Sequence, residues 1–424
     1  MEIVTDGVLP NIEDAPFDEN PGDIFIAIDL GTTTVVALAW QVSTKKILAT
    51  SFEPNAQRKY GADVMSRIEQ ALCGKADLEK KIIQTQLSRL CAKVVFAASE
   101  KIPRPFRATV LSVCITGNST MLSLLLGLSV KGLSALPFSL PSRFGFWTSW
   151  GECFFEESSI SKKTPVYFPP AIGAFVGADT VCAMISAGFD LSSQKSFLLS
   201  DVGTNSELAL FIPNKDGGEG RIICTSCAAG PAFEAANISC GMAGENGAID
   251  NFFVSSNGKI EFHVLGGGEA RGVCGSGLVS AVASLLDAHK ISKDGMIFGE
   301  GSSVLLAPSV FLLQSDIRAL QLAKSAVKTG LDFLLKKTIE LPTFFLAGGF
   351  GSKINVACAK KIALFPKNLS PISIGNAALF GASAILFSQK LQSLSEKIAK
   401  KSIFVNLASY PKFQEDFLKN CSFE

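Results

Sequence analysis

Apolar and polar positions along the chain predict one structural plan that occurs twice. Short apolar runs predict strands, and longer stretches with apolar residues every three or four positions predict helices. The first half has predicted strands at 24–30, 33–40, 46–53 and 108–116, and predicted helices at 63–72, 77–101, 119–126 and 176–187, with a loop-rich aromatic section at 136–165. The second half has predicted strands at 197–201, 207–212, 220–225 and 342–346, and predicted helices at 275–288, 315–336 and 376–389. The halves share the order of elements but no sequence period, so we expect an α/β fold with a duplicated topology.

The length of the chain supports a division into two lobes. At 424 residues, of which 47% are apolar, the chain exceeds what one simple core usually accommodates. We predict a first lobe at 23–190 and a second lobe at 191–424 that ends in a C-terminal helix. Residues 1–22 are acidic and lack periodicity, so they are interpreted as a leader or linker remnant.

Charge and cysteine content restrict the partners and the location. The net charge is +1, whereas nucleic-acid surfaces are normally basic, so no nucleic-acid partner is expected. Two long uncharged stretches, 108–130 and 370–389, are interrupted by glycine and asparagine, and we expect buried elements there rather than membrane spans. An odd number of cysteines, eleven, with no signal peptide favours reduced thiols and a cytoplasmic protein.

Each half contains a glycine turn that follows an aspartate at the end of a strand. The two turns read DLGTTT from Asp29 and DVGTN from Asp201. Such turns present backbone N–H groups and hydroxyls on one side, which suits phosphates. A carboxylate would repel a phosphate unless Mg²⁺ lies between them, often through water, so Asp29 and Asp201 are the predicted Mg²⁺ ligands. The predicted phosphate-binding residues are Gly31, Thr32, Thr33, Thr34, Gly203, Thr204 and Asn205. The alternative for either turn alone is an ordinary hairpin.

A third glycine-rich stretch follows the predicted strand at 342–346. It reads LAGGFGS and permits close approach of a flat ligand or a phosphate to the backbone; the alternative is a tight packing turn. The predicted residues on the adenosine side are Gly348, Gly349, Phe350 and Gly351. Neither G-x-G-x-x-G nor the P-loop motif occurs in this chain, which argues against Rossmann and P-loop folds.

Five motifs in order resemble those of the actin, sugar-kinase and chaperone-ATPase superfamily. They are IDLGTTT, VGADTVCAM, SDVGTNSEL, LAGGFGS and IGNAALFGA. The resemblance implies a duplicated actin-like, ribonuclease H-like fold with two lobes around a nucleotide cleft, in which VGADTVCAM and IGNAALFGA form helices that connect the halves. It also implies catalytic roles for Asp29 and Asp201, and makes Asp179 a candidate to orient the attacking water; the alternative for Asp179 is a charge at a helix N-terminus. For Glu207 and Glu234 two alternatives are likewise open: a position near the ligand, or a structural role.

A narrower resemblance links the chain to the ATP-dependent reductive activators of corrinoid proteins. The motifs that carry it are NAQRKYGADVMSRI, TGNSTMLSLLLGL, CAAGPAFEAANISCGM and GVCGSGLV. The resemblance implies ATP and Mg²⁺ as ligands, and an ATPase that supports reduction of a Co(II) corrinoid to Co(I). The implied partner is a corrinoid iron–sulfur protein or a corrinoid methyltransferase, and a homodimer is expected. Two alternatives stay open: a nucleotide-dependent regulatory module without redox activity, and a small-molecule kinase.

The cysteines depart from the pattern of that family, which usually carries an iron–sulfur ferredoxin domain. No cysteine precedes Cys73, and the only close pair is Cys224 and Cys227. Cluster-binding spacing is therefore lacking, and no iron–sulfur cluster is predicted in this chain. Cys274 is a candidate for a cluster shared between subunits, but most thiols are expected to be core residues. Electrons are expected from a separate ferredoxin-like donor.

Overall fold

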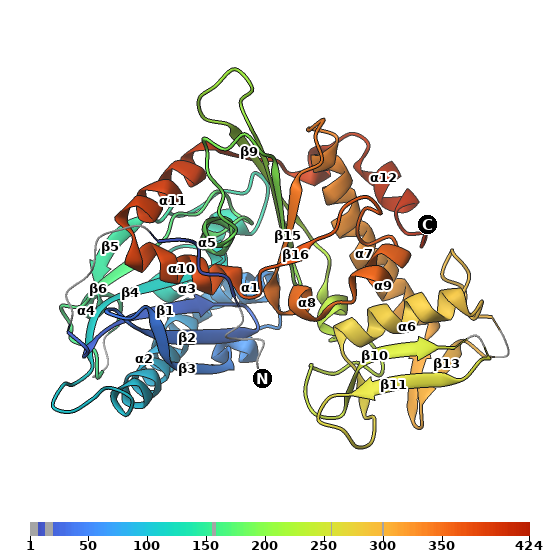
Figure 1. Cartoon of the computed structure of the whole chain (residues 1–424), viewed down its shortest axis with the longest axis horizontal. Helices are drawn as coiled ribbons and strands as arrows, with labels where there is room; N and C mark the ends of the chain where they lie inside the picture. Colours follow the sequence, from blue (N-terminus) through green and yellow to red (C-terminus); the bar gives the residue numbers. More distant parts are fainter. Residues whose placement is uncertain (1–6, 13–19, 155–157, 256, 299–300) are drawn as a thin grey trace.

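The computed structural model describes residues 7–12, 20–154, 158–255, 257–298 and 301–424, and within them two six-stranded sheets form the two lobes (Figure 1). Lobe I has the strand order β3-β2-β1-β4-β6-β5, and lobe II has the order β16-β15-β7-β8-β9-β17. In both lobes an antiparallel meander is followed by a parallel strand beside its first strand. The duplicated topology expected from the sequence is therefore present.

The elements of lobe I begin with the β1–β2–β3 meander, in which β1 and β2 place alternate side chains in two buried clusters. Its strands are β1 Asp23–Leu30, β2 Thr34–Gln41, β3 Lys46–Pro54, β4 Thr109–Gly117, β5 Phe146–Ser149 and β6 Pro165–Phe168. Its helices are α1 Val64–Gln70, α2 Ala76–Ser99, α3 Ser119–Leu126, α4 Trp150–Cys153 and α5 Ala178–Ser186. The section at 136–165, expected to be loop-rich, thus also contributes β5 and α4.

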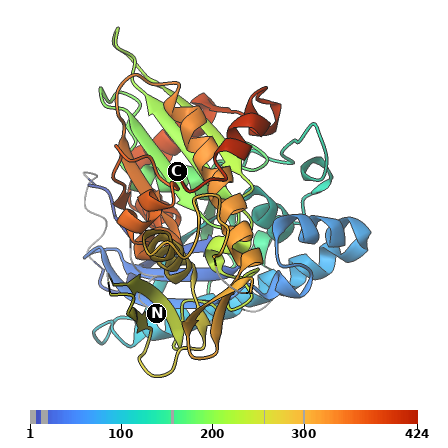
Figure 2. The same ribbon diagram turned by 90° about the vertical axis from the view of Figure 1, so that its right-hand side faces the viewer.

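Lobe II repeats the meander and adds a small satellite unit. Its main strands are β7 Phe197–Val202, β8 Ser206–Ile212, β9 Arg221–Cys227, β15 Thr343–Ala347, β16 Ile372–Ser373 and β17 Ser402–Phe404. Its helices are α6 Gly275–Asp287, α7 Gln314–Leu335, α8 Gly348–Lys353, α9 Val356–Lys361, α10 Ala377–Phe387, α11 Gln389–Lys401 and α12 Phe413–Lys419. The satellite contains β10 Ala248–Val254, β11 Ile260–Val264, β12 Gly272–Val273, β13 Ser303–Ala307 and β14 Val310–Leu313. Figure 1 shows the satellite strands in yellow and orange beneath α6, and Figure 2 shows α7 along the green strands of lobe II.

Helices α5 and α10 join the lobes by packing on each other and across the lobe boundary. The α5 side chains Val181, Met184 and Ile185 share a buried cluster with Leu199 and Phe211 of lobe II. Side chains of α10 share a cluster with the lobe I strands β1 and β2, and this cluster includes Leu379, Phe380, Phe25 and Trp40. Each helix therefore covers the sheet of the other half, as expected of the two connecting helices.

The segment at 1–22 lies largely outside the described residues. In its described part, Leu9 and Ile12 pack against both of the core clusters that contain α5 and α10. The Ser186 hydroxyl donates to the carbonyl of Val8 at 2.6 Å. This part of the segment is thus docked on the core. No described helix has the length and apolarity that crossing a lipid bilayer requires.

Candidate nucleotide-binding cleft

A cleft of about 260 Å³ lies between the lobes and is lined by both predicted glycine turns. One turn connects β1 to β2, and the other connects β7 to β8. The predicted residues that line the cleft are Asp29, Gly31, Thr32, Thr33, Thr34, Asp179, Asp201, Gly203, Thr204, Asn205, Gly348 and Gly349. Residues more than 300 positions apart in the sequence therefore meet around one cavity, because the strand ends of both sheets face it.

Three aspartates converge on the floor of the cleft, and each has a raised pKa. Burial, together with the charges of Asp179 and Asp201, raises the pKa of Asp29 to about 7, although a hydrogen bond from Asn376 Nδ2 to Asp29 Oδ2 at 3.1 Å opposes the shift. Burial and the charge of Asp179 raise the pKa of Asp201 to about 7. Burial also raises the pKa of Asp179 to about 6, against two hydrogen bonds from Thr180. The site thus concentrates negative charge that favours a cation.

All charged residues in the described lining of the cleft are acidic. Asp63, Glu207 and Glu234 join the three aspartates there, and the lining includes no lysine or arginine. Glu207 lies opposite Asp201 in the β7–β8 ladder, and burial raises its pKa well above the usual range. An anionic ligand in this cavity would therefore need a bound cation as counter-charge.

Glu234 links the two glycine turns directly. It ends a short 3₁₀ helix, Pro231–Glu234, and its Oε1 accepts hydrogen bonds from the Thr204 N–H at 3.0 Å and the Thr204 hydroxyl at 2.6 Å. Its Oε2 accepts from the Thr33 hydroxyl at 3.2 Å. Glu234 therefore lines the cleft and also joins the two halves, so both of its predicted roles, near the ligand and structural, stay open.

The glycine-rich stretch after β15 divides between the cleft and the core. Gly348 has φ +86°, and a Cβ there would lie 2.6 Å from Asp201 Oδ1, so a residue without a side chain is required beside this carboxylate. Helix α8 begins at Gly348 and turns Phe350 onto the ring of Phe233, with 4.8 Å between centroids. Gly351 is buried against Leu346. Neither Phe350 nor Gly351 lines the cavity.

Two asparagines at the cleft were not predicted as site residues. Asn118 caps α3 and donates from Nδ2 to the Thr32 hydroxyl at 2.9 Å, and Asn376 caps α10 while it donates to Asp29. Both occur in quoted motifs, TGNST and IGNAALF. The available signal was an asparagine that follows a strand and precedes an apolar helix, in each half.

Most of the cysteines are buried among apolar side chains, while Cys73 is exposed. Cys224 packs with Leu199 on one face of β9, while Cys227 packs with Leu208 on the other. Burial raises the pKa of Cys224 to about 12. Among the described residues, no three His, Cys, Asp or Glu side chains are grouped closely enough to hold a metal ion directly.

Two lobes of one repeated plan, joined by crossing helices around an acidic cleft, define an actin-like ATPase domain. The family described as the C-terminal domain of RACo, the ASKHA domain, matches residues 195–424, and the RACo middle region matches residues 24–192. The chain therefore belongs to the RACo family. This finding confirms the fold class and the family that the motifs indicated.

Relatives of known description agree with this assignment. The corrinoid activation enzyme RamQ of Eubacterium limosum is 32% identical over 97% of this chain and 72% of its own length. The [Co(II) methylated amine-specific corrinoid protein] reductase of Methanosarcina barkeri is 25% identical over 89% of this chain and 72% of its own length. The solved structure of a reductive activator for corrinoid, iron–sulfur protein superposes with a TM-score of 0.80 at 28% identity, over 96% of this chain and 67% of that chain.

Proposed function

We propose that this protein is an ATPase whose nucleotide cycle supports the reduction of a Co(II) corrinoid protein to the Co(I) state. The observation that carries the proposal is the acidic cleft: two glycine turns, one from each lobe, face each other beside Asp29, Asp179 and Asp201. The names of the related proteins supply the corrinoid partner.

The described residues fit a hydrated divalent cation at the floor of the cleft. The carboxylates of Asp29 and Asp201 repel each other, and the lining contains no basic side chain that could neutralise them or a triphosphate. Since no group of three acidic side chains in the described part of the chain is close enough for direct ligation, Asp29 and Asp201 would hold Mg²⁺ through water. The ion would supply the positive charge that lets a polyphosphate share the cavity with carboxylates.

The remaining residues have roles that follow from their positions. The N–H and hydroxyl groups of 31–34 and 203–205 bind the phosphates. Gly348 and Gly349 lie on the adenosine side. Asp179, at the start of α5, orients the attacking water or accepts its proton. Its pKa of about 6 leaves the carboxylate mostly ionised near neutral pH.

The nucleotide cycle has to offset an unfavourable electron transfer. A gap of a few hundred millivolts for one electron corresponds to roughly 5–10 kcal/mol, since about 59 mV is a tenfold change in the equilibrium constant. ATP binding draws the two turns together, the closed protein grips one state of the corrinoid partner, and hydrolysis releases it. Electrons come from a separate ferredoxin-like protein, and the homodimer expected from the sequence stays a prediction that sedimentation tests.

The decisive experiment combines the purified protein, Mg-ATP, a Co(II) corrinoid protein, a ferredoxin and a reductant. We expect ATP hydrolysis to rise when the corrinoid protein is added, and the visible spectrum of Co(I) to appear only with ATP. The Asp201→Asn variant serves as the control. Clean ATP hydrolysis without any response to corrinoid proteins would contradict the proposal in favour of a regulatory module, and phosphorylation of a sugar or acid would indicate a kinase.

A further inference from the structure

The motif NAQRKYGADVMSRI contributes Asp63 to the cleft lining, and two other residues of it contact the first glycine turn from behind. Asn55 Nδ2 donates to the Gly31 carbonyl at 2.8 Å, and the Asn55 backbone N–H donates to the Thr33 carbonyl at 2.9 Å. Arg67 Nη2 donates to the Thr32 carbonyl at 2.6 Å. Three successive carbonyls of the turn are therefore held by two residues of this segment.

We propose that Asn55 and Arg67 are positioning residues that orient the peptide groups of the first turn, so that its N–H groups point at the phosphates of the nucleotide. The inference rests on the proposed nucleotide site. In a trans peptide the carbonyl and the next N–H point in opposite directions. Carbonyls 31, 32 and 33 that are fixed on the buried side therefore direct the N–H groups of residues 32, 33 and 34 toward the cleft.

The two residues that hold the turn, Asn55 and Arg67, are buried and held by several contacts. Asn55 is 1% exposed and Arg67 is not exposed. Arg67 is also tied by Nε to the Gly61 carbonyl at 3.0 Å and by Nη1 to Met121 Sδ at 3.0 Å. It lies on α1, which starts with a reciprocal capping box between Asp63 and Ser66. The guanidinium therefore cannot swing away from the turn without breaking several contacts.

A buried acid, Glu79, lies near enough for its charge to act on Arg67, although burial raises the pKa of Glu79 to about 7. Glu79 on α2 is buried, neither of its carboxylate oxygens has a hydrogen-bond partner among the described atoms, and its charge acts on Arg67. Gln57 connects the same parts, because its N–H donates to Asn55 Oδ1 at 2.8 Å and its Nε2 donates to the Glu79 carbonyl at 3.2 Å. Burying an arginine costs free energy that a smaller apolar residue would not cost. The hydrogen bond from Arg67 to the Thr32 carbonyl is a contact that an apolar residue could not make.

The test separates phosphate binding from adenosine binding. Arg67→Lys keeps the charge but cannot span the Thr32 and Gly61 carbonyls, and Arg67→Met removes both donors. We expect each variant to weaken Mg-ATP binding about 10- to 100-fold by calorimetry, as for loss of a charge-assisted hydrogen bond. Competition by adenosine, which has no phosphates, should change less than about threefold. Arg58→Met, in the same motif but exposed, is the matched control and should bind as the wild type does.

Amide hydrogen exchange provides a second readout, and Asn55→Ala a second variant if both Arg67 variants fail to fold. Exchange should rise in peptides that span 31–35 but not in those that span 203–207. Unchanged ATP affinity in a folded variant, or an equal loss for adenosine and ATP, would overturn the inference. Absence of ATP binding by the wild-type protein would instead refute the proposed function, so the two failures are distinguishable.

Discussion

At the scale of single residues, the buried carboxylates of the cleft destabilise the ligand-free folded protein when they are charged. Asp201 is held beside Asp179 and Gly348, and burial together with the charge of Asp179 raises its pKa from 3.8 to about 7. A carboxyl group whose pKa is raised by folding stabilises the protein fully below its unfolded pKa, and this contribution is lost as the pH rises through the folded value. The ligand-free protein should therefore lose stability between about pH 4 and pH 7.

The variant Asp201→Asn tests this directly. Because an amide carries no charge, we expect the melting temperature of the ligand-free protein at pH 8 to rise by about 1–3 °C, and the gain to vanish at pH 4. ATP hydrolysis should fall at least about 100-fold. Asp216→Asn, an exposed carboxylate in the β8–β9 loop, is the control. An unchanged melting temperature at pH 8 would show that Asp201 is not destabilised by its surroundings.

Glu234 supports a second prediction at this scale. Its carboxylate accepts hydrogen bonds from the Thr33 and Thr204 hydroxyls and from the Thr204 N–H, which are the donors assigned to phosphate. Glu234→Gln removes a negative charge from the phosphate site, so we expect ATP to bind about three- to tenfold more tightly in calorimetry. Glu245→Gln, exposed and outside the cleft lining, should leave the affinity unchanged. Weaker binding by Glu234→Gln would mean that the carboxylate organises the turns instead of competing with the ligand.

At the scale of elements, the sequence predicted those strands and helices that have a periodic pattern of apolar residues. The predicted strands and helices of both halves are present, with ends within two residues of the observed ones. The satellite was missed because β12 has two residues and β11 is exposed at four of its five positions, so neither shows the alternation of a half-buried strand. The helix predicted at 376–389 ends close to Ser388, where α10 and α11 are separated.

The candidate site could be predicted only in part, for a related reason. Both glycine turns are local motifs, and the structure places them at one cleft. The contact of Glu234 with Thr33 joins residues 201 positions apart, and no local pattern encodes it. Likewise, Phe350 was predicted beside the ligand from its glycine neighbours, but the helical start of α8 directs it toward Phe233.

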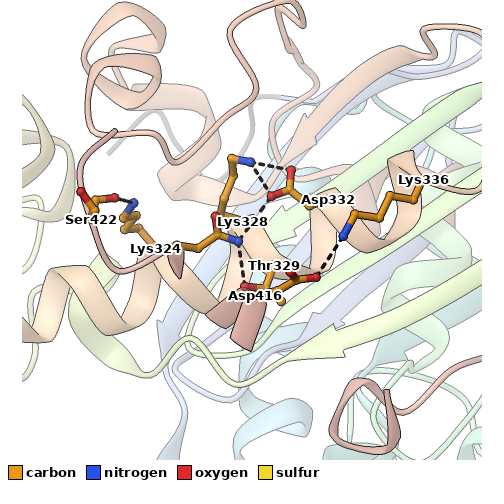
Figure 3. A network of polar contacts seen from close by, with 8 residues as sticks. Lys324, Lys328, Thr329, Asp332, Lys336, Asp416 and Ser422 are labelled. Carbon is orange, nitrogen blue, oxygen red and sulfur yellow. Dashed lines mark hydrogen bonds and ion pairs between the residues drawn. The ribbon is translucent and has the colours of Figure 1, made fainter. Parts of the chain in front are cut away.

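The docking of the C-terminal segment on α7 is a further element that sequence patterns did not specify. Figure 3 shows its polar contacts, Lys336 with Asp416 and buried Lys324 with the Ser422 carbonyl, beside the Lys328–Asp332 ion pair within α7. The Lys324 ammonium also lies 5.5 Å from the centroid of the Phe423 ring. A cation thus anchors the end of the chain inside the lobe II core.

A pH-dependent stability follows from Lys324. Burial lowers its pKa from 10.5 to about 8. Since folding depresses the pKa, the stabilising contribution is present above pH 10.5 and is lost as the pH falls through about 8. The unfolding free energy of the wild type relative to Lys324→Met should therefore rise by about 2 kcal/mol between pH 7 and pH 10, measured with urea. The same comparison with exposed Lys290→Met should be flat, and a flat profile for Lys324 would mean that it keeps its proton when folded.

At the scale of the whole molecule, the crossing of α5 and α10 connects the cleft to the movement of the lobes. Both helices begin at the cleft, α5 with Asp179 and α10 beside Asn376, and each packs on the opposite lobe. A change in the distance between the two glycine turns must therefore alter the packing of one helix on the other. This crossing can transmit the effect of ligand binding from one lobe to the other only if the two helices stay in close contact.

Gly381 is the residue that permits this close contact. A Cβ at this position would lie 1.8 Å from the Cys182 carbonyl oxygen and 2.8 Å from its Cα, so the two backbones touch where the helices cross. Gly381→Ala should push α10 away from α5 and cost about 1–3 kcal/mol of unfolding free energy. Because Asp179 and Asn376 then move apart, ATP hydrolysis and its response to a corrinoid protein should both fall, and small-angle scattering should show less contraction with Mg-ATP.

Gly330→Ala separates this coupling from simple loss of stability. Gly330 lies on α7, where a Cβ would meet Cys227 Sγ at 2.4 Å and Leu208 in the lobe II core, away from the helix crossing. It should lower the unfolding free energy by a similar amount yet keep the contraction with Mg-ATP. If the two variants lose hydrolysis and contraction equally, then general loosening of the core accounts for both, and the crossing of α5 and α10 is a structural joint without a part in the nucleotide cycle.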